Sequence, residues 1–273
     1  MKKPNSGTSN LFLREFAADR TNWGPQMRYF SQGHRCTAYS ARGYTPSDVP
    51  PSKDVYTYIR FYTDALVVLD HLKIEQAHLV GPSMGSYSSL QVGLNTKRAL
   101  ALTFAGEGSG SDLKIWETFA RSATRTTSSS RPSAPTVLPR RRARRRAGLR
   151  SRTTRANGFL GRAGAARFAR LGQLHSFIGR PSIHTLMGAI RKVSTPASII
   201  CGDDDDDCIE PSLFLKRHLL ASGFAMVRKS GHVLYLEERA LFNEIVERFI
   251  ALVEAGRWLP RDPRSMSEAL RSS

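Results

Sequence analysis

The chain has little cysteine and lacks long hydrophobic runs. Only three of its 273 residues are cysteines, too few for a disulfide framework. Cys36 and Cys201 lie in apolar stretches that predict strands, where cysteine acts as a small core residue. No run of about 18 apolar residues occurs, which excludes a membrane-spanning helix. No signal peptide is visible after Met1, so we expect a cytoplasmic protein.

A second absence concerns charge. Residues 121–180 contain no Asp, Glu or Lys, yet they hold 16 of the 41 basic residues, all arginine. The rest of the chain has 25 basic residues against 23 acidic ones, so the formal net charge of +18 belongs almost entirely to this segment. A run of one charge repels itself and cannot be buried, which predicts a poorly ordered segment.

Three interpretations of this arginine-rich segment remain open. We favour a solvated lid with no dedicated partner. Alternatively, Arg140–Arg155 could bind nucleic acid or an anionic membrane non-specifically, with an affinity that falls as salt rises. The third interpretation is a surface for acidic substrates. Aromatic residues for base stacking are limited to Phe159, Phe168 and Phe177, so we expect no dedicated nucleic-acid partner.

The most informative motif is Gly81-Pro82-Ser83-Met84-Gly85. An apolar run precedes it, and a stretch of small residues that can form a helix follows it. This is G-x-S-x-G in a strand–turn–helix context, where the glycines leave room for a serine on a sharp, strained turn. The helix N-terminus beneath that serine favours developing negative charge. The pattern therefore predicts Ser83 as a nucleophile.

A nucleophilic serine needs a base, usually histidine, and an acid that orients the base. The apolar run 196–201 is followed by Gly202 and five aspartates, Asp203–Asp207, and the strand-like run 225–227 by a Gly-His turn. We therefore predict His232 as the base and Asp205 as the acid, with Asp204 second in order and Glu107 in reserve. Contiguous aspartates lack the spacing of a calcium loop, so we expect neither metal nor cofactor.

Strands that alternate with helices predict an α/β protein, with a mostly parallel sheet and helices on both faces. The expected strands are 11–13, 36–39, 77–81, 99–105, 197–201 and 225–228. The expected helices are 56–72, capped by Asp54, and 84–94, 183–192, 211–220 and 237–255. We interpret His71, His78 and His218 as structural, Arg42 and Asp48 as holding a loop, and 257–273 as a loosely attached tail.

With these residues in this order, the sequence resembles the α/β-hydrolase fold superfamily, in its branch of Ser-His-Asp esterases, lactonases and carbon–carbon bond hydrolases. Residues 41–50 are similar to the R-G-x-G-x-S-D-x-P loop of that branch, and 11–16 to its third strand and oxyanion turn. Residues 193–202 and 231–238 are similar to the strands that carry acid and base. The resemblance covers about 11–106 and 182–260.

The resemblance implies a core of residues 1–106 and 183–260, a cap at 107–182 and a tail at 261–273. It also implies hydrolysis of a small ester, lactone or related acyl substrate, with backbone N–H groups of Met84 and Phe16 as the oxyanion hole. Relatives that open epoxides have aspartate in place of Ser83. There are two departures: Arg14-Glu15 replaces His-Gly, and the first two strands are missing. The alternative is a catalytically impaired protein or binding module with an arginine-rich arm.

Overall fold

Six short, mostly apolar runs become six parallel strands in the computed structural model, which describes residues 7–16, 18–44, 46–108 and 179–265. The strands are β1 (Ser9–Phe12), β2 (Arg35–Ala38), β3 (Ala77–Pro82), β4 (Ala99–Ala105), β5 (Ala197–Gly202) and β6 (Ser222–Val227). They pair in the order β2-β1-β3-β4-β5-β6. From β1 the chain adds β2 on one side, and from β3 onward it adds strands on the other side, so the strand order changes direction between β1 and β3. Ligands of open α/β sheets bind at such a switch point, outside the carboxyl ends of the strands.

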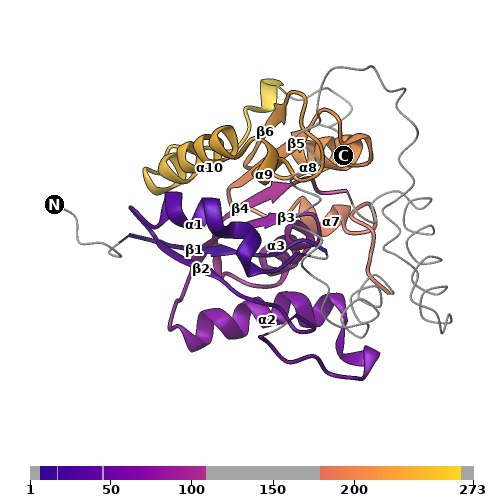
Figure 1. Cartoon of the computed structure of the whole chain (residues 1–273). Coiled ribbons are helices and arrows are strands. Elements are labelled where there is room, and N and C mark those ends of the chain that lie inside the picture. The colour runs from indigo at the N-terminus through magenta and orange to yellow at the C-terminus, as the bar shows by residue number, and fades with distance from the viewer. Residues whose placement is uncertain (1–6, 17, 45, 109–178, 266–273) are drawn as a thin grey trace, which may run out of the picture.

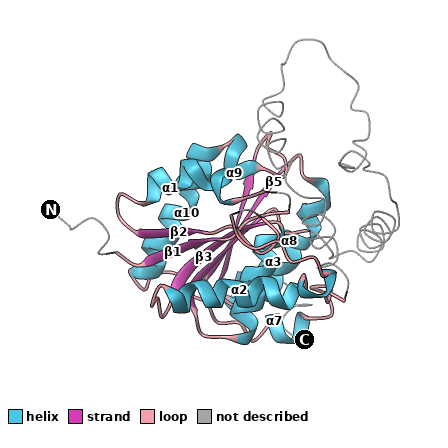
Figure 2. Ribbon diagram, turned by 60° about the horizontal axis from the view of Figure 1, so that its bottom comes forward, coloured by secondary structure: helices cyan, strands magenta, loops and turns pink. Residues whose placement is uncertain are grey.

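Helices cover both faces of the sheet (Figures 1 and 2). They are α1 (Gly24–Phe30), α2 (Tyr58–His71), α3 (Met84–Asn95), α7 (Met187–Ile190), α8 (Asp206–His218), α9 (Leu234–Glu237) and α10 (Arg239–Glu254). Short 3-10 turns span Arg20–Trp23, Lys53–Val55 and Pro263–Ser265. Crossovers through helices are what parallel strands require, because their ends lie at opposite edges of the sheet.

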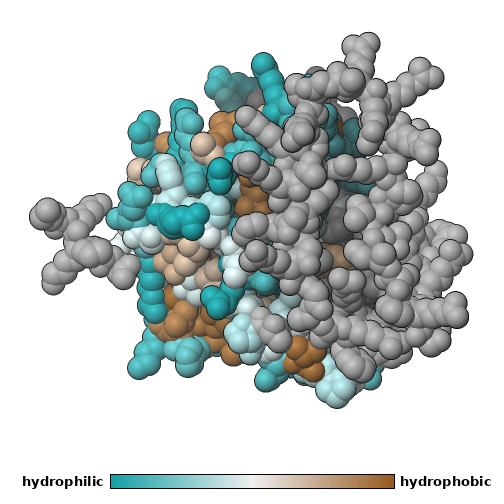
Figure 3. All heavy atoms as spheres, viewed as in Figure 1, coloured by the Kyte–Doolittle hydropathy of each residue, from teal (hydrophilic) through white to brown (hydrophobic). Residues whose placement is uncertain are grey.

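Alternate residues of the strands build two separate cores. Leu79 faces a core made with α2, α3, α7 and α8, whereas its neighbour Val80 faces one made with α1, α9 and α10. On the face seen in Figure 3, hydrophilic side chains lie between smaller hydrophobic patches. The predicted α/β architecture is confirmed, and burial on both faces explains why the central strands are almost continuously apolar.

The predicted helices needed several corrections. Thr57, not Asp54, caps α2, because its side chain accepts from the Arg60 N–H. Helix α8 begins at Asp206, within the acidic run, where acidic side chains favour a helix N-terminus. Only Met187–Ile190 of the expected helix 183–192 is helical, and Glu238 divides the last helix into α9 and α10. Helix α1 was not predicted.

The two ends of the described chain bear on other predictions. In the described sheet β1 is the first strand along the chain, and β2 lies at one edge because it pairs with β1 alone. The tail is not loose at its start: Trp258 packs against Phe249 and donates to the Ala221 carbonyl. Arg261 donates to the carbonyls of Lys216 and Arg217. No helix among the described residues is long and apolar enough to cross a membrane.

Most of the expected cap, residues 109–178, lies outside the described residues, and so do the predictions for Arg140–Arg155. The loop after β2 is described. Arg42 forms an ion pair with Asp64 rather than with Asp48, and its Nε lies 2.6 Å from Asp64 Oδ2. Asp48 contributes its backbone carbonyl to the Gly43 N–H. Arg42 thus joins this loop to α2, as its structural interpretation requires.

Candidate active site

Ser83 occupies a sharp turn between β3 and α3. Its φ of 49° and ψ of −113° lie in a region that non-glycine residues rarely adopt. The Ser83 N–H donates to the Ala105 carbonyl of β4 over 2.8 Å, which fixes the turn to the next strand. A strained backbone conformation of this kind persists only where the surrounding structure holds it in place, and it is common at active sites. The motif therefore has the conformation that its sequence predicted.

Contacts of the two glycines explain their spacing. A Cβ added at Gly81 would lie 2.3 Å from backbone atoms of Gly85, and one added at Gly85 would lie 2.8 Å from the Arg14 carbonyl oxygen. Real Cβ atoms do not approach backbone so closely. Gly81 thus lets α3 begin directly beneath the turn, and Gly85 lets the turn after β1 pack against α3. Met84, the first residue of α3, lies between them.

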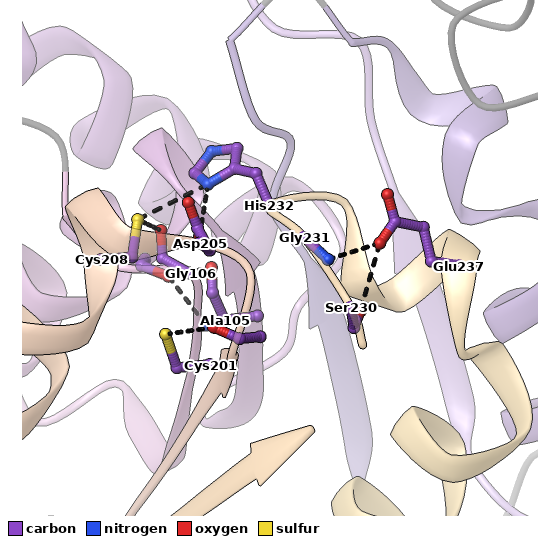
Figure 4. Close-up of polar contacts among 11 residues, drawn as sticks. Ala105, Gly106, Cys201, Asp205, Cys208, Ser230, Gly231, His232 and Glu237 are labelled. Carbon is purple, nitrogen blue, oxygen red and sulfur yellow. Dashed lines mark hydrogen bonds and ion pairs between the residues drawn. The ribbon is translucent and has the colours of Figure 1, made fainter. Parts of the chain in front are cut away.

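The predicted acid and base meet in the structure. His232 Nδ1 lies 2.8 Å from Asp205 Oδ2, as the dashed line in Figure 4 shows. Asp205 lies three residues beyond the end of β5, just before α8, and His232 follows β6 after a short turn. With its proton on Nδ1, the imidazole donates to Asp205 and keeps Nε2 as an acceptor. Ser83 follows β3 at the same edge of the sheet.

The other aspartates of the run have different surroundings. Asp203 Oδ1 accepts from the Lys229 N–H, and Asp204, whose side chain is 58% exposed, forms an ion pair with the Lys229 ammonium. Asp206 and Asp207 are exposed in the first turn of α8. Asp205 is therefore the aspartate of this run that reaches the imidazole. The sequence alone ranked it first without excluding Asp204.

His232 and Asp205 shift each other's pKa values. Burial disfavours the charged form of His232, but the hydrogen bond and the charge of Asp205 outweigh it and raise the pKa of His232 above its ordinary value. Burial likewise opposes the charge on Asp205, and His232 outweighs it and lowers the pKa of Asp205. Because 39% of the imidazole side chain is exposed, water screens part of this attraction. Asp205 thus stabilises the imidazolium that forms when the neutral imidazole accepts a proton on Nε2.

Glu237 holds the loop that carries the histidine. Its Oε2 accepts from the Gly231 N–H over 2.6 Å and from the Ser230 hydroxyl over 3.2 Å (Figure 4). A Cβ added at Gly202 would lie 2.1 Å from the Ser230 carbonyl oxygen, so this loop also packs tightly against the end of β5. Glu237 was noticed in the sequence only as part of a resemblance, because its role depends on contacts six residues away.

Cys208 lies beside the acid and base. Its Sγ is 3.5 Å from His232 Nδ1 and 3.4 Å from the Gly106 carbonyl oxygen. Among the described residues, Asp205, Cys208 and His232 are the group whose ligand atoms are close enough to hold a metal ion. Burial raises the pKa of the Cys208 thiol well above its ordinary value, and the charge of Asp205 adds to that shift. The thiol therefore stays protonated beside the pair.

The turn after β1 carries Arg14 and Glu15 in place of His-Gly, and both are buried. The Arg14 guanidinium lies 3.7 Å from the centre of the Tyr44 ring, and its Nη1 donates to the Glu15 carbonyl. Glu15 accepts from the Tyr235 hydroxyl over 3.0 Å. Neither Arg14 nor Glu15 has a positive φ, so this turn does not need glycine. Phe16 follows in the same turn.

Comparison with known proteins agrees with this geometry. Residues 16–211 match the alpha/beta hydrolase fold family, so the chain belongs to that family. It is 31% identical to 3-oxoadipate enol-lactonase 1 of Acinetobacter baylyi over 114 residues, and this aligned segment covers 41% of this chain and 40% of the relative. Over 82 residues it is 37% identical to epoxide hydrolase 2 of Siraitia grosvenorii, or 30% and 26% of the two chains.

A thermophilic esterase from Thermogutta terrifontis has a similar structure. The TM-score is 0.73 at 19% identity, over 91% of each chain, and so low an identity shows a shared fold alone. The aligned parts of the two sequence relatives span less than half of their lengths. The chain thus belongs to the alpha/beta hydrolase fold family, and the two sequence relatives are named as an enol-lactonase and an epoxide hydrolase.

Proposed function

We propose that this protein is a serine hydrolase of a small carboxylic ester, lactone or related acyl substrate, with Ser83, His232 and Asp205 as its catalytic triad. The strained Ser83 turn supports the proposal, together with the 2.8 Å contact between His232 and Asp205 at the same sheet edge. Epoxide opening is disfavoured, because the residue at the nucleophile position is Ser83 and not aspartate.

In the proposed reaction, Ser83 Oγ attacks the acyl carbon while His232 Nε2 takes the hydroxyl proton. The carbonyl oxygen becomes an oxyanion, which the backbone N–H groups of Met84 and Phe16 stabilise. As the tetrahedral intermediate collapses, His232 returns the proton to the leaving alcohol, and the acyl group remains on Ser83. Water then attacks the acyl-enzyme by the same steps, releasing the acid and restoring the serine.

Each protein group has a defined share in lowering the barrier. Asp205 holds the imidazole in the tautomer whose Nε2 accepts a proton and stabilises the imidazolium that forms. Met84 begins α3, where the helix dipole favours negative charge. One oxyanion-hole donor typically contributes about 10²–10³ in rate. Carbon–carbon bond hydrolysis would use the same residues, so the triad by itself does not choose between these bonds.

The test measures turnover and covalent labelling together. The wild-type protein should hydrolyse p-nitrophenyl acetate or butyrate and react with a fluorophosphonate probe, whereas Ser83→Ala should do neither. Ser88→Ala is the matched control, because Ser88 is equally buried but its hydroxyl donates within α3 to the Met84 carbonyl. It should keep both labelling and turnover.

Two outcomes would count against the proposal. Equal labelling of wild type and Ser83→Ala would remove Ser83 as the nucleophile. Absence of both turnover and labelling in a folded wild type would favour the rival, a catalytically impaired hydrolase-like protein. The observation that favours this rival is the pair of buried charged residues, Arg14 and Glu15, in the turn that precedes Phe16.

A further inference from the structure

Glu107 lies at the same edge of the sheet as the proposed triad but has no part in it. It follows Gly106 at the carboxyl end of β4, the strand between β3, which leads to Ser83, and β5, which leads to Asp205. On one side, the Ala105 carbonyl accepts from the Ser83 N–H, and on the other, the Gly106 N–H donates to Ile200. The backbone at Glu107 is therefore placed between the nucleophile turn and the acid turn.

Contacts of the adjacent residue bring it close to the acid and base. Gly106 has a φ of +57°, and a Cβ added there would lie 3.2 Å from both Asp205 Oδ2 and His232 Nδ1. Glu107 is the next residue along the chain. It does not replace Asp205 as the partner of the imidazole, because Asp205 Oδ2 accepts the hydrogen bond of His232 Nδ1.

The Glu107 carboxyl group is fully buried, with a relative exposure of 0%. Among the described residues, neither of its carboxylate oxygens has a hydrogen-bond partner. Buried polar groups are nearly always hydrogen-bonded, because an unpartnered one loses its hydration without compensation. A group of this kind beside a reactive centre is therefore a candidate to bind something that the described residues do not supply.

The neighbours of Glu107 define what it can bind. The buried Arg180 guanidinium lies 3.9 Å from the centre of the Tyr87 ring, and Tyr87 is one helical turn beyond Ser83. Burial raises the pKa of Glu107 to about 7, although the charges of Arg180 and His232 oppose the shift. Near pH 7 about half of this group is thus the neutral acid, which both donates and accepts. The two nearby cations disfavour a positively charged ligand.

We propose that Glu107 recognises a hydroxyl group of the substrate close to the scissile carbonyl, so that hydroxy esters or hydroxy lactones are preferred over unsubstituted ones. The inference rests on the proposed function, because it places the hydroxyl next to the carbon that Ser83 attacks. A hydroxyl group matches a neutral carboxylic acid, since each can donate one hydrogen bond and accept another.

The experiment compares substrates that differ by one hydroxyl group. Methyl butyrate is compared with methyl 3-hydroxybutyrate for the acyl side, ethyl butyrate with 2-hydroxyethyl butyrate for the alcohol side, and γ-butyrolactone with β-hydroxy-γ-butyrolactone. Acid release is followed with a pH indicator. The wild type should show a ratio of kcat/KM of at least about tenfold in favour of the hydroxylated member of one pair.

Two isosteric variants test whether Glu107 causes the preference. Glu107→Met removes both hydrogen-bonding atoms and should bring the ratio close to one. Glu107→Gln keeps a donor and an acceptor and should retain most of the preference. Asp206→Asn, which changes an exposed carboxylate in the first turn of α8, is the control and should leave the ratio unchanged.

Several results would overturn the inference. A wild type that turns over both members of every pair equally would do so, as would a Glu107→Met variant in which both members slow down by the same factor. If Glu107→Met does not fold, inhibition of the wild type gives an independent measure: 3-hydroxybutyrate is compared with butyrate for the acyl side, and ethylene glycol with ethanol for the alcohol side. Equal inhibition within both pairs contradicts the proposal. A folded wild type with no turnover and no labelling of Ser83 would instead remove the proposed function itself.

Discussion

The two sides of the proposed site are built in different ways. On the β5–β6 side, hydrogen bonds hold the turns: Asp205 contacts His232, and Glu237 accepts from the Gly231 N–H. On the β1 side, buried charged side chains hold the turn, because the Arg14 guanidinium lies over the Tyr44 ring and Glu15 accepts a hydrogen bond from the Tyr235 hydroxyl.

This difference explains why one side is easier to find in the sequence. On the β5–β6 side the sequence has the expected glycine–histidine turn and an aspartate shortly after a strand. The turn is held by the hydrogen bond from the Gly231 N–H to Glu237. The β1 side departs from the expected His-Gly. Its shape instead depends on packing partners such as Tyr44 and Tyr235, which lie far away in the chain. A local motif can therefore change while the turn that it encodes is held by distant residues.

The largest effect is expected when the acid–base contact is broken. Asp205→Asn should lower kcat by about 10³–10⁴, because an amide no longer selects the imidazole tautomer or stabilises its charge. Without the carboxylate, the pKa of His232 should also fall, so the rate should rise with pH at lower pH than in the wild type. Steady-state kinetics across pH measures both.

Asp204→Asn is the control for that variant, because Asp204 is largely exposed and pairs with Lys229 instead. Its kcat should differ from that of the wild type by less than about threefold, because an exposed ion pair contributes little energy. A loss in Asp204→Asn as large as that in Asp205→Asn would show that the acid has been assigned to the wrong residue.

Substitution of Glu107, which lies after the strand between β3 and β5, should alter how the stability of the protein depends on pH. Because the pKa of Glu107 is raised to about 7 in the folded protein, the folded state binds this proton more tightly than the unfolded chain. The contribution is fully present below the unfolded pKa, near 4.5, and is lost as pH rises through about 7. Glu107→Gln should therefore be more stable than wild type at pH 8, by up to about 3 kcal/mol.

Urea unfolding at pH 4 and pH 8 measures this difference, and the gap between variant and wild type should be larger at pH 8. A gap that is the same at both pH values would mean that Glu107 ionises in the folded protein as it does in the unfolded chain. In that case its carboxyl group would not be held in a low-polarity environment.

Loosening the histidine loop should have an intermediate effect. Glu237→Ala removes the acceptor for the Gly231 N–H and the Ser230 hydroxyl and should lower kcat by about 10–100-fold, since small misplacements of a catalytic group are costly. Glu237→Gln keeps an acceptor and should restore most of the rate. KM should change less than kcat, because Glu237 acts through His232.

The exposed Glu244 of α10 provides the control, since Glu244→Ala should leave kcat unchanged. If Glu237→Gln were as slow as Glu237→Ala, with equal losses in thermal stability, the contribution of Glu237 would be to folding rather than to the position of His232.

The smallest effect is expected on the β1 side. Tyr235→Phe removes the hydroxyl that donates to the buried Glu15 and should destabilise the protein by about 1–3 kcal/mol, the usual effect of leaving a buried acceptor unsatisfied. The rate should fall by less than about tenfold, because backbone N–H groups, not the Glu15 side chain, are the proposed oxyanion donors.

Tyr29→Phe is the matched control, because the Tyr29 hydroxyl donates to Glu247 at the surface and should change the stability by less than about 0.5 kcal/mol. Chemical denaturation measures both variants. A rate loss in Tyr235→Phe as large as in Glu237→Ala would show that the β1 side is as sensitive to geometry as the histidine loop.

Much of the fold could be predicted from local pattern. A predicted strand overlaps each of the six observed ones, and the signal is strongest for β3 and β5, which are apolar and buried throughout. Helix ends were less predictable. Asp205–Asp207 gave no periodic signal for the start of α8, and the choice of Thr57 over Asp54 as a cap depends on where the chain enters α2.

The order of residues along the chain determined the class of fold, the strained serine turn, and the two strand ends that supply an acid and a base, because these follow from local sterics and hydropathy. The tertiary structure decided which aspartate reaches the imidazole, and it placed Arg14 against Tyr44 and Glu15 against Tyr235 in the turn where the family pattern has His-Gly. It also left the Glu107 carboxyl group buried with no hydrogen-bond partner in the part of the chain that the structure describes. These outcomes depend on contacts between distant segments, and such contacts leave no periodic signal in a sequence.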